Sequence, residues 1–277
     1  MKMLHRIDFL MLLSVSCANP NGDPLCGGKP RTDLSGYGII TDVSIKRRLR
    51  DRLAAMGEPI LVTPQTADSD CIAKRISAVK PLNCKELCSR FLDVRMFGQV
   101  FALKHSPIST DSVRGAVSIA HAISLHPIEI IELPITRCIN ADFCHGRGRD
   151  TMGFRSIVRY ALYEIKGTIN SHYATLNGFT SDDADKLKQA LLSLYDNDIS
   201  VARPAGSMAI ERLYTWKHST ACGNYPMHLV YNTVRAELRP GIERPLCFDD
   251  YIITEQPLPE LTPEITVFRR PMDVSFN

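Results

Sequence analysis

The chain has few aromatic residues and no large excess of charge of either sign. Phe, Trp and Tyr make up 7% of its 277 residues, Trp occurs once, and the formal net charge is +3. A mildly basic balance permits nucleic-acid binding without requiring it, so the local placement of charge has to decide. Because few rings lie near the basic segments, we expect base stacking on Phe or Tyr to be a minor mode of any such binding.

The common catalytic and cofactor motifs are absent as well. There is no G-x-S-x-G nucleophile elbow, no H-E-x-x-H, no P-loop and no G-x-G-x-x-G following a strand. The nine Cys lack the paired C-x-x-C spacing of a structural zinc site. An odd number of Cys in a chain of this length is most simply explained by free thiols in a reducing compartment. We therefore expect no cofactor, no metal and a cytoplasmic protein.

No apolar run is long enough to cross a membrane, so we expect no membrane association. The start, "MKMLHRIDFLMLLSVSCA", resembles a signal peptide or lipoprotein signal, and a secreted lipoprotein is one alternative. However, Asp8 interrupts the segment, and its apolar residues alternate from Ile7 to Val15 with polar positions such as Ser14 and Ser16. That period favours a strand over residues 5–17 with one strongly apolar face.

The rest of the chain alternates between strand and helix patterns. Residues 18–37 are rich in Pro and Gly and are expected to form an irregular loop. Thr41 is a suitable N-cap for a helix over residues 41–56, whose apolar positions fall in one stripe. Further segments follow in sequence order: a short strand at 59–62, helices at 67–80, 84–92 and 181–195, several strands between 113 and 219, and a surface tail from 257. This order predicts a single α+β domain with long insertions, which are often functional.

Basic residues are concentrated in two places. "KRRLR" (46–50) puts Lys46, Arg47 and Arg50 beside the apolar stripe of the first helix, while Arg48 and Arg52 flank its other edge. The second place is the Gly-rich loop "CHGRGRDTMG" (144–153). Such runs are often only solvated surface, but together with flexible backbone they also suit a groove that follows a phosphate backbone.

Motifs along almost the whole chain resemble one family. They are, in order, "NPNGDP", "KPRTD", "GIITDVSIKRRLRD", "DVRMFG", "VRGAVSIAHAISLHPI", "ITR", "TMG", "YALYEIKGTIN", "GSMAIERLYTWKHS" and "GNYPMH". Each motif is weak alone, but their shared order resembles the Cas-seven family, the Cascade backbone subunits of type I CRISPR systems, with type I-C closest and I-B next.

The resemblance implies a non-catalytic role. Family members have a modified RNA-recognition-motif (ferredoxin-like) palm with inserted finger and thumb regions, and several copies assemble head-to-tail along one guide RNA. They hold the guide extended and periodically kinked, so that base pairing reads the target DNA and the protein reads backbone and shape. The expected partners are therefore guide RNA (crRNA), target DNA through the guide, further copies of the chain and other Cascade subunits.

The resemblance also implies where RNA is bound. The first helix would face the guide phosphates, the loop from Asn19 to Arg31 would lie on the palm beside it, and the thumb would fall between residues 126 and 153 of one domain spanning 1–277. The expected RNA contacts are Asn19, Asn21, Lys29, Arg31, Lys46, Arg47, Arg50, Arg114, Arg137, Arg147, Arg149 and Arg155.

One segment departs from the family pattern, and one alternative function stays open. After "TMG" the family often carries a basic tract, whereas here Arg155 stands between Phe154 and Ser156. The alternative function is a metal-dependent ribonuclease that uses Asp23 or Asp93. One carboxylate in "NPNGDP" is too few for a dedicated cation site, and an Asx-type turn is the simpler interpretation of Asp23.

Overall fold

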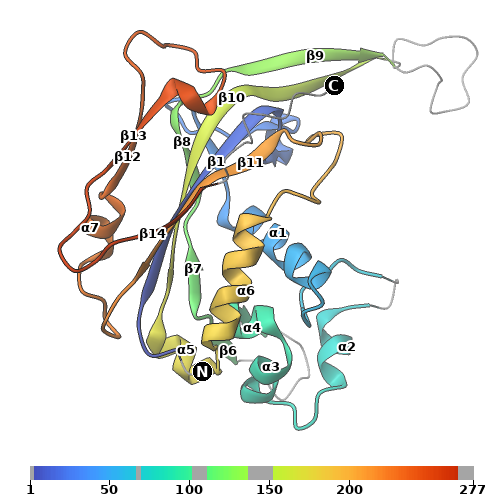
Figure 1. Cartoon of the computed structure of the whole chain (residues 1–277). Coiled ribbons are helices and arrows are strands. Elements are labelled where there is room, and N and C mark those ends of the chain that lie inside the picture. The colour runs from blue at the N-terminus through green and yellow to red at the C-terminus, as the bar shows by residue number, and fades with distance from the viewer. Residues whose placement is uncertain (1–2, 67–69, 102–110, 137–151, 268–277) are drawn as a thin grey trace, which may run out of the picture.

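The computed structural model describes residues 3–66, 70–101, 111–136 and 152–267. An antiparallel eight-stranded sheet forms its centre, with six strands in the order β14-β11-β1-β10-β8-β4 and with β7 and β9 also paired to β10 (Figure 1). The strands are β1 Ile7–Ala18, β4 Tyr37–Ile40, β7 Val117–Ile119, β8 Ala122–Pro127, β9 Ile130–Thr136, β10 Met152–Ile169, β11 Met208–Lys217 and β14 Glu264–Val267. The chain is a mixed α+β protein, as its sequence pattern predicts.

Two strand–helix–strand units interleave within this sheet. Helix α1 (Asp42–Ala55) lies between β1 and β8 in the chain, and helix α6 (Ser181–Leu192) lies between β10 and β11. In space β1 sits between β10 and β11, while β10 sits between β1 and β8. The middle of the sheet is thus built from segments far apart in the sequence.

β1 is the central strand because both of its faces are apolar. Phe9 and Met11 face a core shared with α1 and α6, and Leu10 and Leu12 face a second core on the other side. The alternation in the sequence correctly predicts the strand and its first face. It misses the second, which is also apolar and therefore needs a covering layer of its own.

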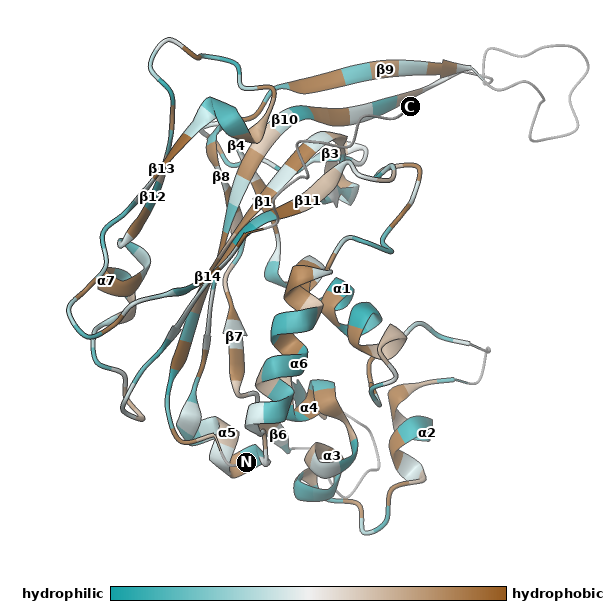
Figure 2. Ribbon diagram, in the orientation of Figure 1, coloured by the Kyte–Doolittle hydropathy of each residue, from teal (hydrophilic) through white to brown (hydrophobic). Residues whose placement is uncertain are grey.

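Helices cover one face of the sheet (Figures 1 and 2). The Thr41 hydroxyl accepts a hydrogen bond from the amide of Ser44 at 3.3 Å, which caps α1 as predicted. The apolar stripe of α1, Ile45, Leu49 and Leu53, is fully buried. α5 (Ser171–Asn177) and α6 complete this layer, and the predicted helix at 181–195 is confirmed as α6.

A hairpin and a short helix cover the opposite face of the sheet. Strands β12 (Val234–Leu238) and β13 (Tyr251–Glu255) pair with each other, and α7 (Met227–Tyr231) packs beside them over β1 and β11 (Figure 1). Tyr214 and Trp216 of β11 are fully buried beneath this layer, with their rings stacked at a centroid distance of 6.1 Å.

A helical lobe with its own small core adjoins the helix layer. It contains α2 (Ile72–Ser77), α3 (Cys84–Arg90), α4 (Leu92–Phe97) and the short hairpin of β5 (Gly98–Val100) and β6 (Ser112–Arg114). The predicted strand at 59–62 is wrong, because the amides of Leu61 and Val62 donate instead to the carboxylate of Asp93. The helix expected at 84–92 is divided in two by extended backbone at Phe91.

Two segments expected to be irregular contain short strands. The loop after β1 holds the hairpin of β2 (Gly22–Asp23) and β3 (Lys29–Pro30), with a 3-10 turn at Pro24–Cys26 between them. The tail, expected to lie over the surface, adds β14 to the edge of the sheet beside β11.

Candidate nucleic-acid interface

A two-stranded ribbon projects from the body of the sheet (Figure 1). β9 pairs with the first part of β10, from Met152 opposite Thr136 to Val158 opposite Ile130, and β1 joins β10 only from Val158 onward. The ribbon exposes apolar side chains on both faces, including Phe154, which is 74% exposed, and Leu133 on the opposite face. Exposed apolar groups on a projecting element are typical of a contact surface.

The loop from Asn19 to Arg31 is packed against the base of this ribbon. The Asn19 amide donates to the carbonyl of Gly28 at 2.7 Å and to that of Ser156 in the ribbon at 3.3 Å. Lys29 forms an ion pair with Glu132 of β9, and hydrogen bonding to this carboxylate raises the pKa of Lys29. The loop and the ribbon therefore form one continuous surface on the side of the sheet that carries the helices.

The same loop is joined to the start of α1. The side-chain oxygen of Asn21 accepts hydrogen bonds from the amide and the hydroxyl of Thr41, both at 3.0 Å. Just before the loop, Cys17 adopts a left-handed conformation with φ of 51°, which is rare for a residue with a Cβ. Asn19 and Asn21 thus position the loop, and their side chains are already engaged within the protein.

The basic residues of α1 are all engaged with other side chains. Lys46 pairs with Asp42 at 3.0 Å, and Arg47 pairs with Asp51 at 2.9 Å on the exposed side of the helix. Arg50 points inward, where its Nε lies 3.1 Å from the carboxylate of Asp93. Lys46 and Arg47 therefore remain accessible to a ligand, whereas Arg50 holds α1 to the helical lobe.

Arg31, Arg114 and Arg155 lie in three different settings. Arg31 pairs with Asp23 within the loop at 3.4 Å. Arg114 is exposed at the end of β6, where its guanidinium donates to the hydroxyl of Tyr173 at 2.8 Å and stacks over that ring. Arg155 lies on the face of the ribbon opposite Glu132 and has no ion-pair partner among the described residues. Arg137, Arg147 and Arg149 lie outside the described residues.

Apart from the projecting ribbon with its exposed Phe154, the described part of the sheet offers no open face for bases to stack on. Its aromatic residues Tyr160, Tyr214 and Trp216 lie under the β12–β13 hairpin and α7 and are buried. Many RNA-binding modules built on a four-stranded sheet stack bases on exposed rings. In this chain that surface is filled by protein, so the helix side and the ribbon are the surfaces left for a nucleic acid.

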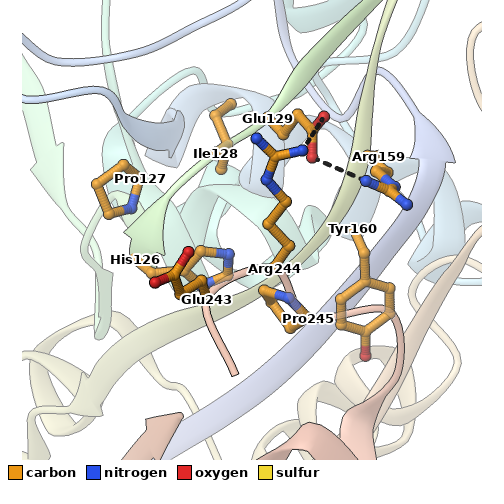
Figure 3. Close-up of a pocket in the computed structure, with 9 residues that line it drawn as sticks. All are labelled: His126, Pro127, Ile128, Glu129, Arg159, Tyr160, Glu243, Arg244 and Pro245. Carbon is orange, nitrogen blue, oxygen red and sulfur yellow. Dashed lines mark hydrogen bonds and ion pairs between the residues drawn. The ribbon is translucent and has the colours of Figure 1, made fainter. Parts of the chain in front are cut away.

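A cleft of about 340 Å³ opens next to the base of the ribbon (Figure 3). Arg159 and Arg244 reach the carboxylate of Glu129 from two sides, at 3.1 and 3.9 Å. Burial lowers the pKa of His126, which keeps its ring neutral near pH 7. With Glu243 also lining the cleft, its carboxylates balance its guanidinium groups, so the cleft has no excess charge that would attract a phosphate.

The two carboxylates considered for nuclease chemistry have structural contacts. Asp93 is 1% exposed, and its carboxylate accepts from the amides of Leu61 and Val62, at 2.8 and 3.1 Å, and from Arg50. Asp23 caps the 3-10 turn by accepting from the amide of Leu25 at 3.0 Å. The described residues contain no group of three or more His, Cys, Asp or Glu that could hold a metal ion.

Sequence reasoning missed the residues that accompany these basic groups. Tyr173 was not expected beside Arg114, and Arg203 was not expected near the first helix, where it shares Asp198 with Arg48. Both partners come from segments more than fifty residues away, so no local spacing signals them. Within the part of the chain that the structure describes, no helix is long and apolar enough to span a membrane.

Three comparisons with known proteins agree with one another. A family model described as CRISPR-associated protein Cas7 matches residues 5–256. A CRISPR-associated protein Cas7 of Haloferax volcanii is 27% identical over 218 residues, covering 68% of this chain and 63% of the relative. The chain thus spans slightly less than two thirds of that relative's length.

The fold also has a solved counterpart. A chain of a structure titled "CRISPR RNA-guided surveillance complex, pre-nicking" superposes with a TM-score of 0.51 at 16% identity, covering 76% of this chain and 78% of that chain. At this identity the similarity concerns the fold. The family match is the more extensive of the two, since it includes every strand of the sheet except β14, the ribbon, the helical lobe and the β12–β13 hairpin.

Proposed function

This chain belongs to the CRISPR-associated protein Cas7 family, and from that premise we propose that it is a non-catalytic backbone subunit of a type I CRISPR surveillance complex (Cascade), nearest to subtype I-C and then I-B. Several copies line one guide RNA in the cytoplasm, hold it extended and kinked, and leave its bases free to pair with target DNA. The observation that carries the proposal is the family match over residues 5–256.

The topology supports an RNA-recognition-motif-like palm within a single domain. Interleaved β1-α1-β8 and β10-α6-β11 units, in the strand order β11-β1-β10-β8, follow the ferredoxin-like pattern. In this proposal the helical lobe of α2 to α4 is the finger region. The ribbon of β9 and the first part of β10 forms the thumb together with the connection expected at 126–153, so Arg137, Arg147 and Arg149 stay proposed contacts near its end.

The guide path, the surface along which guide RNA would lie, is inferred from which surface of the protein is open. Because the β12–β13 layer fills the sheet face, the guide lies on the helix side, along the loop Asn19–Arg31, beneath the ribbon and beside the start of α1. Lys29 and Lys46 supply accessible charge there, while Asn19, Asn21 and Arg50 act by fixing the surface. Arg155 serves the opposite face of the ribbon, where further copies or other Cascade subunits meet it.

Neutralising two lysines tests this path. The double variant Lys29→Gln and Lys46→Gln removes charge from the proposed groove and disturbs only partly exposed ion pairs. A matched control is Arg235→Gln with Lys80→Gln, since both residues are exposed, one on the β12–β13 hairpin and one in the helical lobe.

Guide-RNA affinity measured across a salt series gives the readout. Each lost phosphate contact lowers the slope of log affinity against log salt by about one. We expect the groove variant to lose about two units of slope for every RNA sequence and the control variant to lose almost none. Equal losses in the two variants would remove the proposed path while leaving the family membership intact.

A further inference from the structure

A second basic site lies on the other edge of α1. A cavity of about 250 Å³ opens between α1 and the turn that follows α6. Arg48 and Arg52 line it from the helix, and Leu194, Asn197 and Asp198 line it from the turn. Positions 48 and 52 are four residues apart, so they lie one above the other on one face of the helix. Lys46 and Arg50 lie on the opposite edge, so this cavity is separate from the proposed guide path.

The charges around the cavity do not balance. Arg48 and Arg203 share a single carboxylate, that of Asp198, at 2.6 and 2.7 Å. Asp51 also lines the cavity, but it pairs with Arg47. The lining itself holds two guanidinium groups, those of Arg48 and Arg52, and these two carboxylates. Because Arg47 and Arg203 pair with the carboxylates from outside the lining, the cluster as a whole has an excess of two positive charges.

Arg52 carries much of that excess. Its Nε donates to the hydroxyl of Ser193 at 2.8 Å. With the Asn197 amide turned so that its oxygen faces Arg52, as the surrounding donors and acceptors require, Nη1 donates to that oxygen at 3.0 Å. Both acceptors are neutral, and no carboxylate among the described residues pairs with Arg52. A guanidinium held in place by neutral groups is pre-organised to bind an anion.

A buried hydroxyl beside the cluster is left without a partner. Tyr195 is 8% exposed, its hydroxyl makes no hydrogen bond, and the guanidinium of Arg48 lies 5.8 Å from its ring centre. Arg48, Asp198 and Arg203 are the charged groups around that hydroxyl, and burial raises the pKa of Tyr195 to about 12. It therefore stays protonated, and a buried donor of this kind normally has an acceptor.

We propose that this cavity binds a phosphate group, with Arg48 and Arg52, which line it, as its main ligands and with Arg203, which pairs with Asp198 at its edge, as a third. Planar guanidinium groups match the oxygens of phosphate and bind them with charge-assisted hydrogen bonds. In the free protein Asp198, which is 26% exposed, occupies two of the three guanidinium groups. The incoming phosphate competes with this carboxylate, adds contacts to Arg52 and neutralises the excess charge. The site takes either a free phosphate compound or a phosphate of a nucleic-acid backbone.

Thermal unfolding of the full chain in increasing inorganic phosphate, with chloride at matched ionic strength as the reference, tests the site. We expect a saturable rise in the unfolding midpoint with phosphate. Arg52→Gln should weaken the apparent phosphate affinity about tenfold, as loss of a charge-assisted hydrogen bond does. The matched control Arg235→Gln, an exposed arginine on the β12–β13 hairpin, should change that affinity by less than about twofold.

A second variant should act in the opposite direction. Asp198→Asn removes the competing carboxylate and should tighten phosphate binding, whereas Asp196→Asn, an exposed carboxylate two residues earlier, should not. If the cluster were only an internal salt bridge, Asp198→Asn would lower stability without changing the phosphate response. Absence of a saturable rise, equal effects of Arg52→Gln and Arg235→Gln, or no tightening in Asp198→Asn would overturn the proposal.

Binding of a single-stranded RNA oligonucleotide to the same variants separates the two sources of phosphate. Weakening by Arg52→Gln but not by Arg235→Gln identifies a nucleic-acid phosphate as the ligand. Unchanged RNA binding, together with the lost phosphate response, identifies a free phosphate compound. The Lys29 and Lys46 variant keeps the phosphate response in either case, so this site and the guide path are tested independently.

Discussion

Replacing Asp93 by Asn tests whether this residue holds the structure together or performs chemistry. Asp93 is 1% exposed, and its carboxylate joins the end of α1, through Arg50, to the amides of Leu61 and Val62. Asn keeps the shape and one acceptor oxygen but removes the charge. It also places an amide donor where Arg50 or a backbone amide already donates.

The expected loss of stability follows from the burial of the Arg50–Asp93 ion pair. Breaking a buried ion pair by removing one partner costs roughly 3–5 kcal/mol. The side chain of Arg50 is 14% exposed, so some solvent screening remains and we expect the lower end, about 3 kcal/mol. At roughly 2 °C per kcal/mol for a chain of this size, the unfolding midpoint should fall by about 6 °C. Asp51→Asn breaks the exposed pair with Arg47 and should cost less than about 1 kcal/mol.

Thermal and urea unfolding of the two variants give the comparison. A midpoint for Asp93→Asn no lower than that of Asp51→Asn would refute the structural role of the buried carboxylate. Such a result, combined with magnesium-dependent RNA cleavage that the variant loses, would favour the nuclease alternative.

Two further substitutions test how stability depends on pH and how tightly the core is packed. Burial alone would raise the pKa of Asp183, but hydrogen bonds from Arg95 and the Thr180 cap lower it overall. Its stabilising effect is therefore present above the unfolded-state pKa and lost as pH falls below about 4. In Asp183→Asn the free energy of unfolding should accordingly depend less on pH in that range than it does in the unchanged protein. Gly167→Ala would drive a Cβ into the ring of Phe9 and should cost about 1–3 kcal/mol. Gly153→Ala, in open space, should be nearly neutral in the same urea unfolding experiment.

Local signals were sufficient to predict the first strand and the first helix. The alternating apolar residues of β1 and the Thr41 cap with its buried stripe are determined by neighbours within a few positions. The same holds for α6, which begins at Ser181 after a capping box at Thr180. These elements keep their predicted form because tertiary contacts reinforce the local preference.

Long-range contacts explain where the sequence-based prediction of structure was wrong or incomplete. Residues 59–62 have the composition of a strand, yet the amides of Leu61 and Val62 find their acceptor on Asp93, about thirty positions away. Likewise, the second apolar face of β1 is covered by a hairpin more than two hundred residues later. Hydrophobic periodicity predicts a buried face, but it does not identify the segment that buries it.

The sequence locates the basic residues of the candidate interface but not the groups that pair with them. The basic run of α1 was correctly found in the sequence, but its charges looked free because Asp93 and Asp198, their partners, come from elsewhere in the chain. Asn19 and Asn21 were chosen for possible RNA contact, and the structure gives them a positioning role. A sequence reveals where charge is concentrated, whereas the fold decides which opposite charges neutralise it.

The most direct test of the guide-holding role is the RNA content of the assembled protein. The chain should be co-expressed with a guide, purified at moderate salt, and its bound RNA sized and counted against protein. We predict RNA of one discrete length with several copies of the chain on each molecule. A protein that stays free of RNA and monomeric in the presence of the guide would contradict the account.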